Sequence, residues 1–282
     1  MHLNKISNFA RSHSACFTFL HYKMIITLLS DLGTRDPAIP VAKAILMQHV
    51  ADAALIDISH QVMQYDIRQA AYLLLSAYRS FAKGTVHIIA VDIFAGPAPC
   101  MLLAKKDGHY FIAPDNGILP LAFGTELENT RMCYECSRPY SFSDWMRNAG
   151  TVITTVMQGW VLPYRKCEVK NAPKIRQHQV TPYGVDCNIL YVDRYKNVVL
   201  DISRKQFDKV ANNRPFSIQL FRMSVSAIST HYNEVPVKEP LCRFNNAGFL
   251  EIAVNQGHAA TLLGLDSVNT SDLRYQTVRI FF

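Results

Sequence analysis

Residues 24–36, MIITLLSDLGTRD, carry the first signal of the fold. The apolar run over 24–29 is typical of a buried β-strand, and it ends abruptly in a polar turn that contains Asp31. Gly33 allows this turn to be tight, because glycine adopts backbone angles that other residues avoid. A second carboxylate follows at Asp36. Two acids after a buried strand indicate either helix capping and a surface position or a polar site at the strand end.

Strand-like and helix-like segments alternate through the first half of the chain. Strands are expected over 54–58, 85–91, 101–104 and 110–113, and helices over 39–50, 66–80 and after 114–117. In 66–80 the apolar residues recur with helical spacing, and Asp66 is a suitable N-cap. This alternation predicts an α/β fold with a doubly wound, mostly parallel sheet.

Several of these expected strands end in polar side chains. Asp31, His60, Asp92 and Asn116 each lie where an apolar run stops. Ligands of open α/β sheets bind outside the carboxyl ends of the strands, so these residues predict a shared crevice. Each of them alone could be a simple turn residue.

The sequence predicts four regions. Residues 1–23 are basic and lack a cleavage site, so we expect a disordered N-terminal extension, or a true start at Met24. An α/β domain is expected over 24–164 and a polar linker over 165–180. Strands dominate 181–282, which predicts a smaller C-terminal β-barrel or sandwich domain, with strands over 185–192, 198–202, 216–221, 249–254 and 277–282.

The composition excludes several classes of protein. Of 282 residues, 49% are hydrophobic and 18% are charged, as in ordinary folded soluble domains. The net charge is +7, but the basic residues are scattered, which argues against a nucleic-acid partner. No apolar run is long enough to cross a membrane.

The cysteines and glycines predict no metal and no cofactor. Cys133 and Cys136 form the one close pair, and a structural zinc site needs two further ligands. We therefore expect seven reduced cysteines in a cytoplasmic protein. Neither GxGxxG nor GxxxxGK[ST] occurs, so a nicotinamide or nucleoside triphosphate enzyme is disfavoured.

Six motifs occur in the order expected of one family. They are SDLGTRD (30–36), DISHQVMQYDIRQAA (57–71), GTVHIIAVD (84–92), APDNG (113–117), VDRYKNV (192–198) and GFLEIAVNQGHAA (248–260). With them the chain resembles the S-adenosylmethionine (SAM) hydroxide adenosyltransferases, relatives of the fluorinases and chlorinases. The resemblance implies an α/β domain, a C-terminal β-barrel and a homotrimer whose site lies between two subunits. It also implies attack of water or hydroxide on the ribose C5′ of SAM, which releases adenosine and methionine.

The resemblance assigns roles in the first domain. Asp31 would accept hydrogen bonds from the two ribose hydroxyls, and Asp36 would lie near the cationic methionine portion. Tyr65 would place an aromatic face beside the sulfonium, although it could be a packing residue. Asp92 would be the catalytic carboxylate that orients the nucleophile.

In the second domain the resemblance assigns the remaining contacts. Asp193 would hold the methionine ammonium and Asn197 would bind the adenine edge, unless the two only form a hairpin turn. Tyr195 and Tyr232 would stack on the purine. Further substrate-binding positions are Asn246, which could equally be a turn residue, Glu251, Val254 and Asn255.

The chain departs from the family at two positions of an Asp–Arg–His trio. Asp92 is present, but Pro99 stands seven residues later where the arginine is expected. The counterpart of the histidine motif reads Ser-Phe-Ser-Asp over 141–144. Ser143, His60 or His87 could contribute instead, with the histidines expected to be structural. A SAM hydrolase and a SAM- or nucleoside-binding protein with weak or no catalysis both remain open. A halogenase ranks third, because Asp92 would repel a halide.

Overall fold

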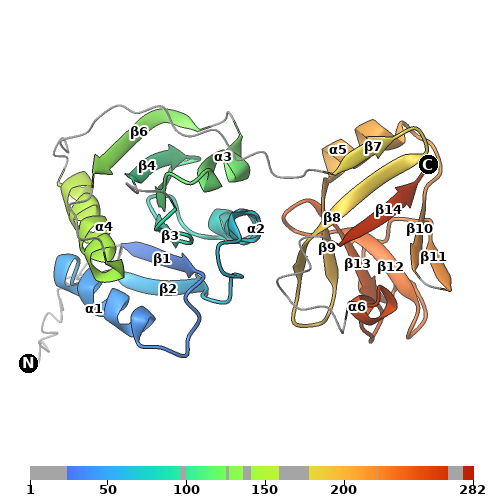
Figure 1. Ribbon diagram of the computed structural model, residues 1–282, viewed down its shortest axis with the longest axis horizontal. Helices are drawn as coiled ribbons and strands as arrows, with labels where there is room; N and C mark the ends of the chain where they lie inside the picture. The colour runs from blue at the N-terminus through green and yellow to red at the C-terminus, as the bar shows by residue number, and fades with distance from the viewer. Residues whose placement is uncertain are drawn as a thin grey trace, which may run out of the picture.

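The computed structural model describes residues 24–95, 100–124, 127–135, 141–158, 178–220, 222–265 and 276–282, with only the backbone described over 128–135. Its strands form two separate sheets, one in each half of the chain (Figure 1). The expected extension over 1–23 lies outside the described residues, as do Pro99, Cys136 and nearly all of the expected linker.

The first sheet combines a parallel half with an antiparallel edge. Its strands are β1 (Ile25–Ser30), β2 (Ala54–Ser59), β3 (Val86–Ala90), β4 (Cys100–Lys106), β5 (His109–Pro114) and β6 (Glu128–Glu135), in the order β2-β1-β3-β5-β4-β6. The strands β2, β1, β3 and β5 run parallel, whereas β4 is antiparallel to both its neighbours. The reversal comes from the hairpin between β4 and β5: Asp107 and Gly108 both have positive φ, as a two-residue hairpin turn requires.

Helices cover both faces of this sheet, as expected. On one face lie α1 (Ala38–His49) and α4 (Phe142–Met157), and on the other α2 (Ile67–Ala77) and α3 (Ile118–Phe123), with a 3₁₀ turn, η1 (Tyr78–Ser80), after α2. Alternation along β1 supplies both cores, because Ile26 and Leu28 pack under α1 and Leu29 packs under α2. Asp66 caps α2 as expected, accepting from the backbone N–H groups of Arg68 and Gln69.

The second sheet is antiparallel and nearly closed. Its strands are β7 (Gln179–Thr181), β8 (Gly184–Val192), β9 (Val198–Ser203), β10 (Ser217–Leu220), β11 (Met223–Val225), β12 (Pro240–Phe244), β13 (Phe249–Val254) and β14 (Thr277–Phe281). The order is β11-β10-β14-β8-β9-β13-β12, with β7 added beside β8. The two edges approach each other just after β11, where Ile228 forms a β-bridge with Cys242. The expected β-barrel is therefore confirmed.

Short helices also occur in this domain, where only strands were expected. They are α5 (Arg204–Ala211), α6 (Ala259–Leu262) and the 3₁₀ turn η2 (Tyr232–Glu234). A capping box between Ser203 and Gln206 begins α5. Phe207 then packs into the barrel core. Of the cysteines, Cys187 and Cys242 are buried in this core as thiols.

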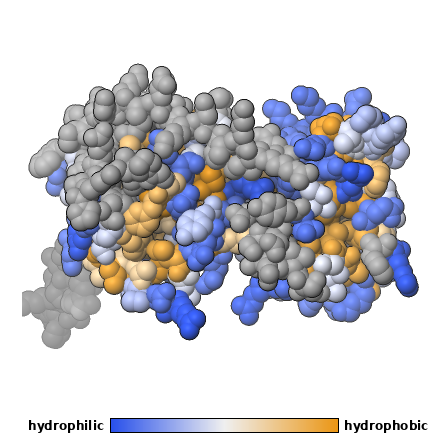
Figure 2. Space-filling view, in the orientation of Figure 1, coloured by the Kyte–Doolittle hydropathy of each residue, from blue (hydrophilic) through white to orange (hydrophobic). Residues whose placement is uncertain are grey.

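The two domains touch at Tyr72 on α2. Its hydroxyl accepts a hydrogen bond from Asn245 Nδ2 at 3.1 Å, and its ring lies 5.7 Å from the rings of Tyr191 and Phe249. Apolar residues, in orange, are visible on the surface of both domains, with hydrophilic residues, in blue, beside them (Figure 2). No helix among the described residues has the length and hydrophobicity to cross a membrane.

A candidate ligand site in two halves

The first half of the site lies at the carboxyl ends of β1, β2 and β3, and Asp31 is its centre. The Asp31 Oδ2 atom accepts hydrogen bonds from the backbone N–H of Tyr65 at 3.0 Å and of Asp92 at 3.3 Å. Both donors have left-handed backbone angles, with φ of 63° and 49°. Such angles are unfavourable for residues other than glycine and need support from their surroundings. One carboxylate therefore holds the other two expected site residues in place.

This arrangement excludes one alternative for Asp31. The N-cap residue of α1 is Pro37, and no side chain caps that helix. Helix capping by Asp31 is therefore wrong. Among the described residues, the hydrogen bonds of Asp31 use Oδ2 only, so Oδ1 is the oxygen available to a ligand.

Asp92 is half-buried beside Asp31. Burial raises the pKa of the Asp92 carboxyl above its usual range, and the nearby Asp31 charge raises it further. Asn116 fixes the surrounding loop, since its Nδ2 lies 3.0 Å from the Val91 carbonyl and 3.3 Å from that of Asp92. Its Oδ1 accepts from the Ile118 N–H at the start of α3. The expected convergence of polar groups at these strand ends is thus present.

The turn after β1 also has the expected glycine geometry. Gly33 has φ of 68°, and its N–H donates to the His60 carbonyl at 2.7 Å. Asp36 lies at the exposed end of the same turn, just before α1. The structure thus places Asp36 near the surface, and its contact with a ligand remains a prediction.

Two exposed aromatic residues lie near the carboxylates along the backbone, since Tyr65 donates its N–H to Asp31 and Phe94 follows Asp92 by two residues. Tyr65 is 68% exposed and Phe94 is 52% exposed. Such exposure argues against the packing interpretation of Tyr65. The sequence analysis did not select Phe94, although a large apolar residue two positions after a strand-end carboxylate was a usable signal.

The second half of the site is a cavity of about 610 Å³ in the C-terminal domain. Its lining includes five expected residues, namely Asp193, Tyr195, Asn197, Tyr232 and Val254. The sequence analysis missed its other lining residues, which are Arg194, Gln256, Gly257 and His258. All four fall within the motifs quoted over 192–198 and 248–260, so extending the assignment along those motifs would have found them.

Asp193 and Asn197 pair with each other across the turn between β8 and β9. The Asp193 carboxylate accepts from the Asn197 N–H at 2.8 Å and from its Nδ2 at 3.0 Å. Lys196 takes a left-handed angle, with φ of 64°, which completes the turn. The hairpin interpretation is confirmed for the backbone, but Asn197 is buried rather than solvent-facing. Binding of a ligand by either residue remains a prediction.

Glu251 and Tyr232 form a second polar group at this cavity. The Tyr232 hydroxyl donates to Glu251 Oε1 at 2.7 Å. Burial raises the pKa of Glu251 above its usual range, and burial together with Glu251 raises the pKa of Tyr232 to about 12. The Arg243 guanidinium lies 4.6 Å from the centre of the Tyr232 ring. Arg243 lies opposite Glu251 in the register of β12 and β13, and it was not predicted from the sequence.

The last two expected positions are placed differently. Asn246 is exposed at the turn between β12 and β13, so the interpretation of Asn246 as a turn residue is confirmed. The hydrogen bonds of this turn are made by its neighbour Asn245. Asn255 donates through Nδ2 to the Val235 carbonyl at 2.7 Å and so holds the cavity wall.

The two expected histidine helpers are both engaged elsewhere. His87 is fully buried between Thr27 and His109, with ring nitrogens 2.7 Å from Thr27 Oγ1 and 3.2 Å from His109 Nδ1. His60 Nδ1 lies 2.8 Å from Ser30 Oγ. Both therefore have structural partners, as expected. Across the described residues, no group of three His, Cys, Asp or Glu side chains could hold a metal ion.

Among the described residues, the C-terminal cavity is lined by none of the residues of the strand-end half. Each lining residue of the C-terminal cavity falls between 193 and 258, whereas Asp31, Tyr65 and Asp92 belong to the N-terminal sheet. Each half presents carboxylates and exposed aromatic rings, groups that suit a ligand with hydroxyls, a cationic centre and a flat ring.

An α/β domain with carboxylates at its strand ends, followed by a β-barrel with a cavity lined partly by polar side chains, is a two-domain architecture with a candidate small-molecule site. The chain belongs to the SAM hydroxide adenosyltransferase family: the model of the family's N-terminal domain matches residues 26–153, and that of its C-terminal domain matches residues 187–270.

Relatives and solved structures agree with this assignment. The chain is 27% identical over 255 residues to the (R)-S-adenosyl-L-methionine hydrolase of Thermus thermophilus, covering 85% of this chain and 95% of that one. It is 25% identical over 266 residues to the enzyme of the same name from Methanocaldococcus jannaschii, covering 89% and 96%. A fluorinase from Actinoplanes sp. matches over 118 residues at 29% identity, which is 34% of this chain and 40% of the fluorinase. An uncharacterized conserved protein from Thermotoga maritima superposes with a TM-score of 0.73 at 25% identity, covering 91% of this chain and all of that one.

Proposed function

We propose that the protein hydrolyses SAM to adenosine and L-methionine by attack of water or hydroxide at the ribose C5′. The observation that carries this proposal is the hydrogen bonding of Asp31 to the backbones of Tyr65 and Asp92. It brings a ribose-binding carboxylate, an exposed aromatic ring and a second carboxylate to one strand-end edge. The relatives named (R)-S-adenosyl-L-methionine hydrolase, which cover most of the chain, support the same reaction.

The groups divide the chemistry between them. The leaving group is a neutral thioether that departs from a sulfonium, so the protein must align the nucleophile and hold the ribose rather than activate the leaving group. Asp31 Oδ1 binds the ribose hydroxyls, and Tyr65 lies beside the sulfonium. Asp92 accepts a hydrogen bond from the attacking water and orients it towards C5′. Asp36 lies near the methionine portion.

The C-terminal cavity supplies the remaining contacts. Asp193 binds the methionine ammonium, and Asn197 binds the adenine edge. Tyr195 and Tyr232 stack on the purine, and residues 251–255 hold the adenine through the backbone and through Glu251. Both tyrosines are exposed, at 75% and 41%. The Arg243 guanidinium lies over one face of the Tyr232 ring, so a base would stack on the other face of that ring.

We further propose a cytoplasmic homotrimer in which the N-terminal half-site of one subunit meets the C-terminal half-site of its neighbour. The separation of the two halves within one chain supports this arrangement. So do the exposed Val41 and Met47 on α1 and Ile56 on the edge strand β2, at 41%, 54% and 39% exposure, because exposed large apolar side chains and an unpaired strand edge both suit a subunit contact. Buried thiols at Cys187 and Cys242 suit a reducing compartment.

A second candidate function is binding of SAM or adenosine without efficient turnover. One observation favours it: Ser141 and Asp144, at the position of the family's histidine motif, form the capping box of α4. Asp144 also forms an ion pair with Arg147 at 2.9 Å. The side chains of Ser141 and Asp144 therefore stabilise the first turn of α4. Ser143 would be the hydroxyl left to contact the water.

Incubation of the pure protein with SAM, followed by chromatographic measurement of adenosine, tests the proposal. We expect adenosine and methionine in equal amounts, and no product above background from Asp92→Ala. Equal traces of adenosine from both proteins, together with saturable SAM binding by calorimetry, would instead establish the binding protein. Added chloride or fluoride is expected to give no 5′-halo nucleoside, and its formation would establish a halogenase.

A further inference from the structure

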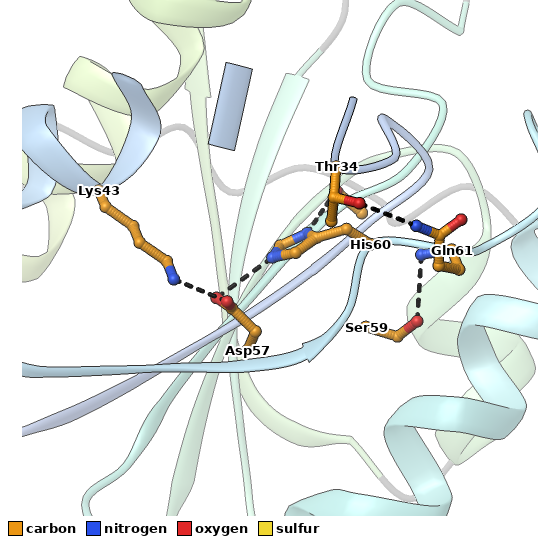
Figure 3. A network of polar contacts seen from close by, with 7 residues as sticks. Thr34, Lys43, Asp57, Ser59, His60 and Gln61 are labelled. Carbon is orange, nitrogen blue, oxygen red and sulfur yellow. Dashed lines mark hydrogen bonds and ion pairs between the residues drawn. The ribbon is translucent and has the colours of Figure 1, made fainter. Parts of the chain in front are cut away.

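A series of polar side chains connects α1, β2 and the last residue of β1, Ser30, which directly precedes Asp31 in the sequence. Figure 3 shows its members Lys43, Asp57 and His60. Lys43 Nζ donates to Asp57 Oδ2 at 2.6 Å, Asp57 Oδ1 lies 3.1 Å from His60 Nε2, and His60 Nδ1 lies 2.8 Å from Ser30 Oγ. Ser30 and His60 are 2% and 4% exposed, whereas the side chains of Asp57 and Lys43 are 39% and 31% exposed. These side-chain contacts therefore run from the protein surface to the buried end of β1.

The order of these groups resembles the Ser–His–Asp arrangement of a nucleophilic hydrolase. Such a nucleophile must reach its substrate, and Ser30 is sealed from solvent. A role as nucleophile is thus excluded. What the array does supply is orientation: a carboxylate at Nε2 favours the tautomer with its proton there, which leaves Nδ1 to accept from the Ser30 hydroxyl.

The same segment also grips the turn that carries Asp31. The His60 carbonyl accepts from the Gly33 N–H at 2.7 Å, and Gln61 Nε2 donates to Thr34 Oγ1 at 3.2 Å. The Ser30 contact lies before Asp31 in the sequence, and the Gly33 and Thr34 contacts lie after it. The turn is therefore held on both sides of Asp31. Figure 3 shows Thr34, His60 and Gln61 side by side at this point.

The charge of Asp57 keeps this series of polar contacts in place at neutral pH. Burial acts to raise the pKa of Asp57, but the hydrogen bond from Lys43 and the close contact with His60 outweigh it and hold that pKa below its usual range. Asp57 is therefore ionised and able to orient the imidazole. Burying a serine hydroxyl and an imidazole without partners would be costly, so each contact stabilises this one geometry.

We propose that His60, oriented by Asp57 and Lys43, is a positioning residue that sets where the Asp31 carboxylate lies and thereby fixes the spacing of Tyr65 and Asp92. This inference rests on the proposed function for its kinetic consequences. Its structural consequence is independent of function, because the Tyr65 and Asp92 amides report directly on Asp31 through their hydrogen bonds.

Two isosteric variants separate the two sides of the imidazole. The amide of His60→Asn can occupy the Nδ1 position and keep the Ser30 contact, whereas that of His60→Gln reaches the Nε2 position and loses it. Asp57→Asn removes the orienting charge from the exposed end, and Asp52→Asn, an exposed acid in the turn before β2, is the matched control. Backbone hydrogen exchange at Gly33, Tyr65 and Asp92 is measured for all four, with kcat and KM for SAM.

We expect His60→Gln to speed exchange at Tyr65 and Asp92 by about five- to tenfold, which corresponds to the loss of roughly one hydrogen bond. Its kcat/KM should fall about 10- to 100-fold, since small displacements of aligned groups have effects of that size. His60→Asn should stay within about threefold of wild type by the same reasoning. Asp57→Asn should lie between these two, and Asp52→Asn should match wild type.

Wild-type exchange at Tyr65 and Asp92 in both His60→Gln and Asp57→Asn would overturn the inference. So would faster exchange spread evenly over the whole N-terminal sheet, which a merely structural role predicts. If His60→Gln fails to fold, Asp57→Asn decides, since its side chain is near the surface. If the wild-type protein neither binds nor hydrolyses SAM, the proposed function fails, while the exchange measurements still decide the positioning role.

Discussion

The carboxyl group of Asp92 follows the end of β3, and the Asp92 backbone N–H donates to a second acid, Asp31. It is half-buried, its own backbone is held by Asp31, and burial and the Asp31 charge both raise its pKa. Groups with pKa values shifted by burial and a like charge are common at functional sites. The proposed reaction needs Asp92 as an acceptor, and therefore ionised.

Replacing Asp92 by asparagine should lower kcat at least about 100-fold, the usual range for loss of a positioned general base. Adenosine affinity, measured by calorimetry, should change little, because other groups hold the nucleoside. In the wild-type protein kcat should rise with pH through the folded pKa of Asp92, which lies above 3.8. Asp31→Asn should move this acidic limb to lower pH, because it removes the neighbouring negative charge. An acidic limb that stays in place would show that another group titrates.

At the scale of elements, the turn after β1 depends on one glycine. Gly33 has φ of 68°, and a Cβ at this position would meet no atom within 4 Å. Substitution therefore costs backbone strain and creates no clash. Gly264, just after α6, has φ of 69° and equally open surroundings, so it provides a matched control far along the chain.

Gly33→Ala and Gly264→Ala should each lower the free energy of unfolding by about 1 kcal/mol, the usual cost of a left-handed angle for alanine. Only Gly33→Ala should also raise KM for SAM, because its turn carries Asp31 and Asp36. Urea denaturation and steady-state kinetics on both variants check this. Equal kinetics in the two variants would mean that the turn does not control substrate binding.

Most elements of the fold could be predicted from the sequence because their signals are local. The apolar run of β1, the helical spacing and Asp66 cap of α2, and the Asp107-Gly108 hairpin each lie within a few residues. The helix α5 was missed because its polar face dominates a short segment, and only Phe207 and Ala211 are buried. The sequence also indicated that Asp31 and Asp92 converge, but not that one carboxylate oxygen binds two backbone amides. That contact depends on the left-handed angles of Tyr65 and Asp92, which leave no pattern in a sequence.

At the scale of the whole molecule, a buried histidine pair links stability to pH. His87 is fully buried, and burial, with a smaller effect of His109, lowers the pKa of His87 to about 3. Folded His87 is therefore neutral, while the unfolded chain takes up a proton below about pH 6.5. The stability contributed by neutral His87 is fully present above that pH and is lost as the pH falls towards 3.

Between pH 6.5 and about 4.5, His87 should make the free energy of unfolding fall by up to roughly 1.4 kcal/mol per pH unit. His87→Phe should flatten this slope but not abolish it, since burial also lowers the pKa of His109. The exposed His258→Gln serves as control and should keep the wild-type slope. Urea titrations at several pH values measure all three, and an unchanged slope in His87→Phe would contradict the assignment.

A site shared between subunits makes a prediction that a site within one chain does not. Asp92→Asn damages the N-terminal half-site, and Asp193→Asn damages the C-terminal one. Each variant alone should be nearly inactive. When the two are co-expressed and assemble at random, a subunit with an intact N-terminal half can meet a neighbour with an intact C-terminal half. In a closed ring with one site at each interface, about a quarter of the sites should then be intact and recover activity in proportion.

Mixing the two purified variants under conditions that prevent subunit exchange controls for contamination. If the co-expressed protein is no more active than this mixture, the two halves act within one chain or Asp193 is not part of the site. The activity of Asp193→Asn alone distinguishes these outcomes, because it should match that of the wild-type protein if Asp193 has no role.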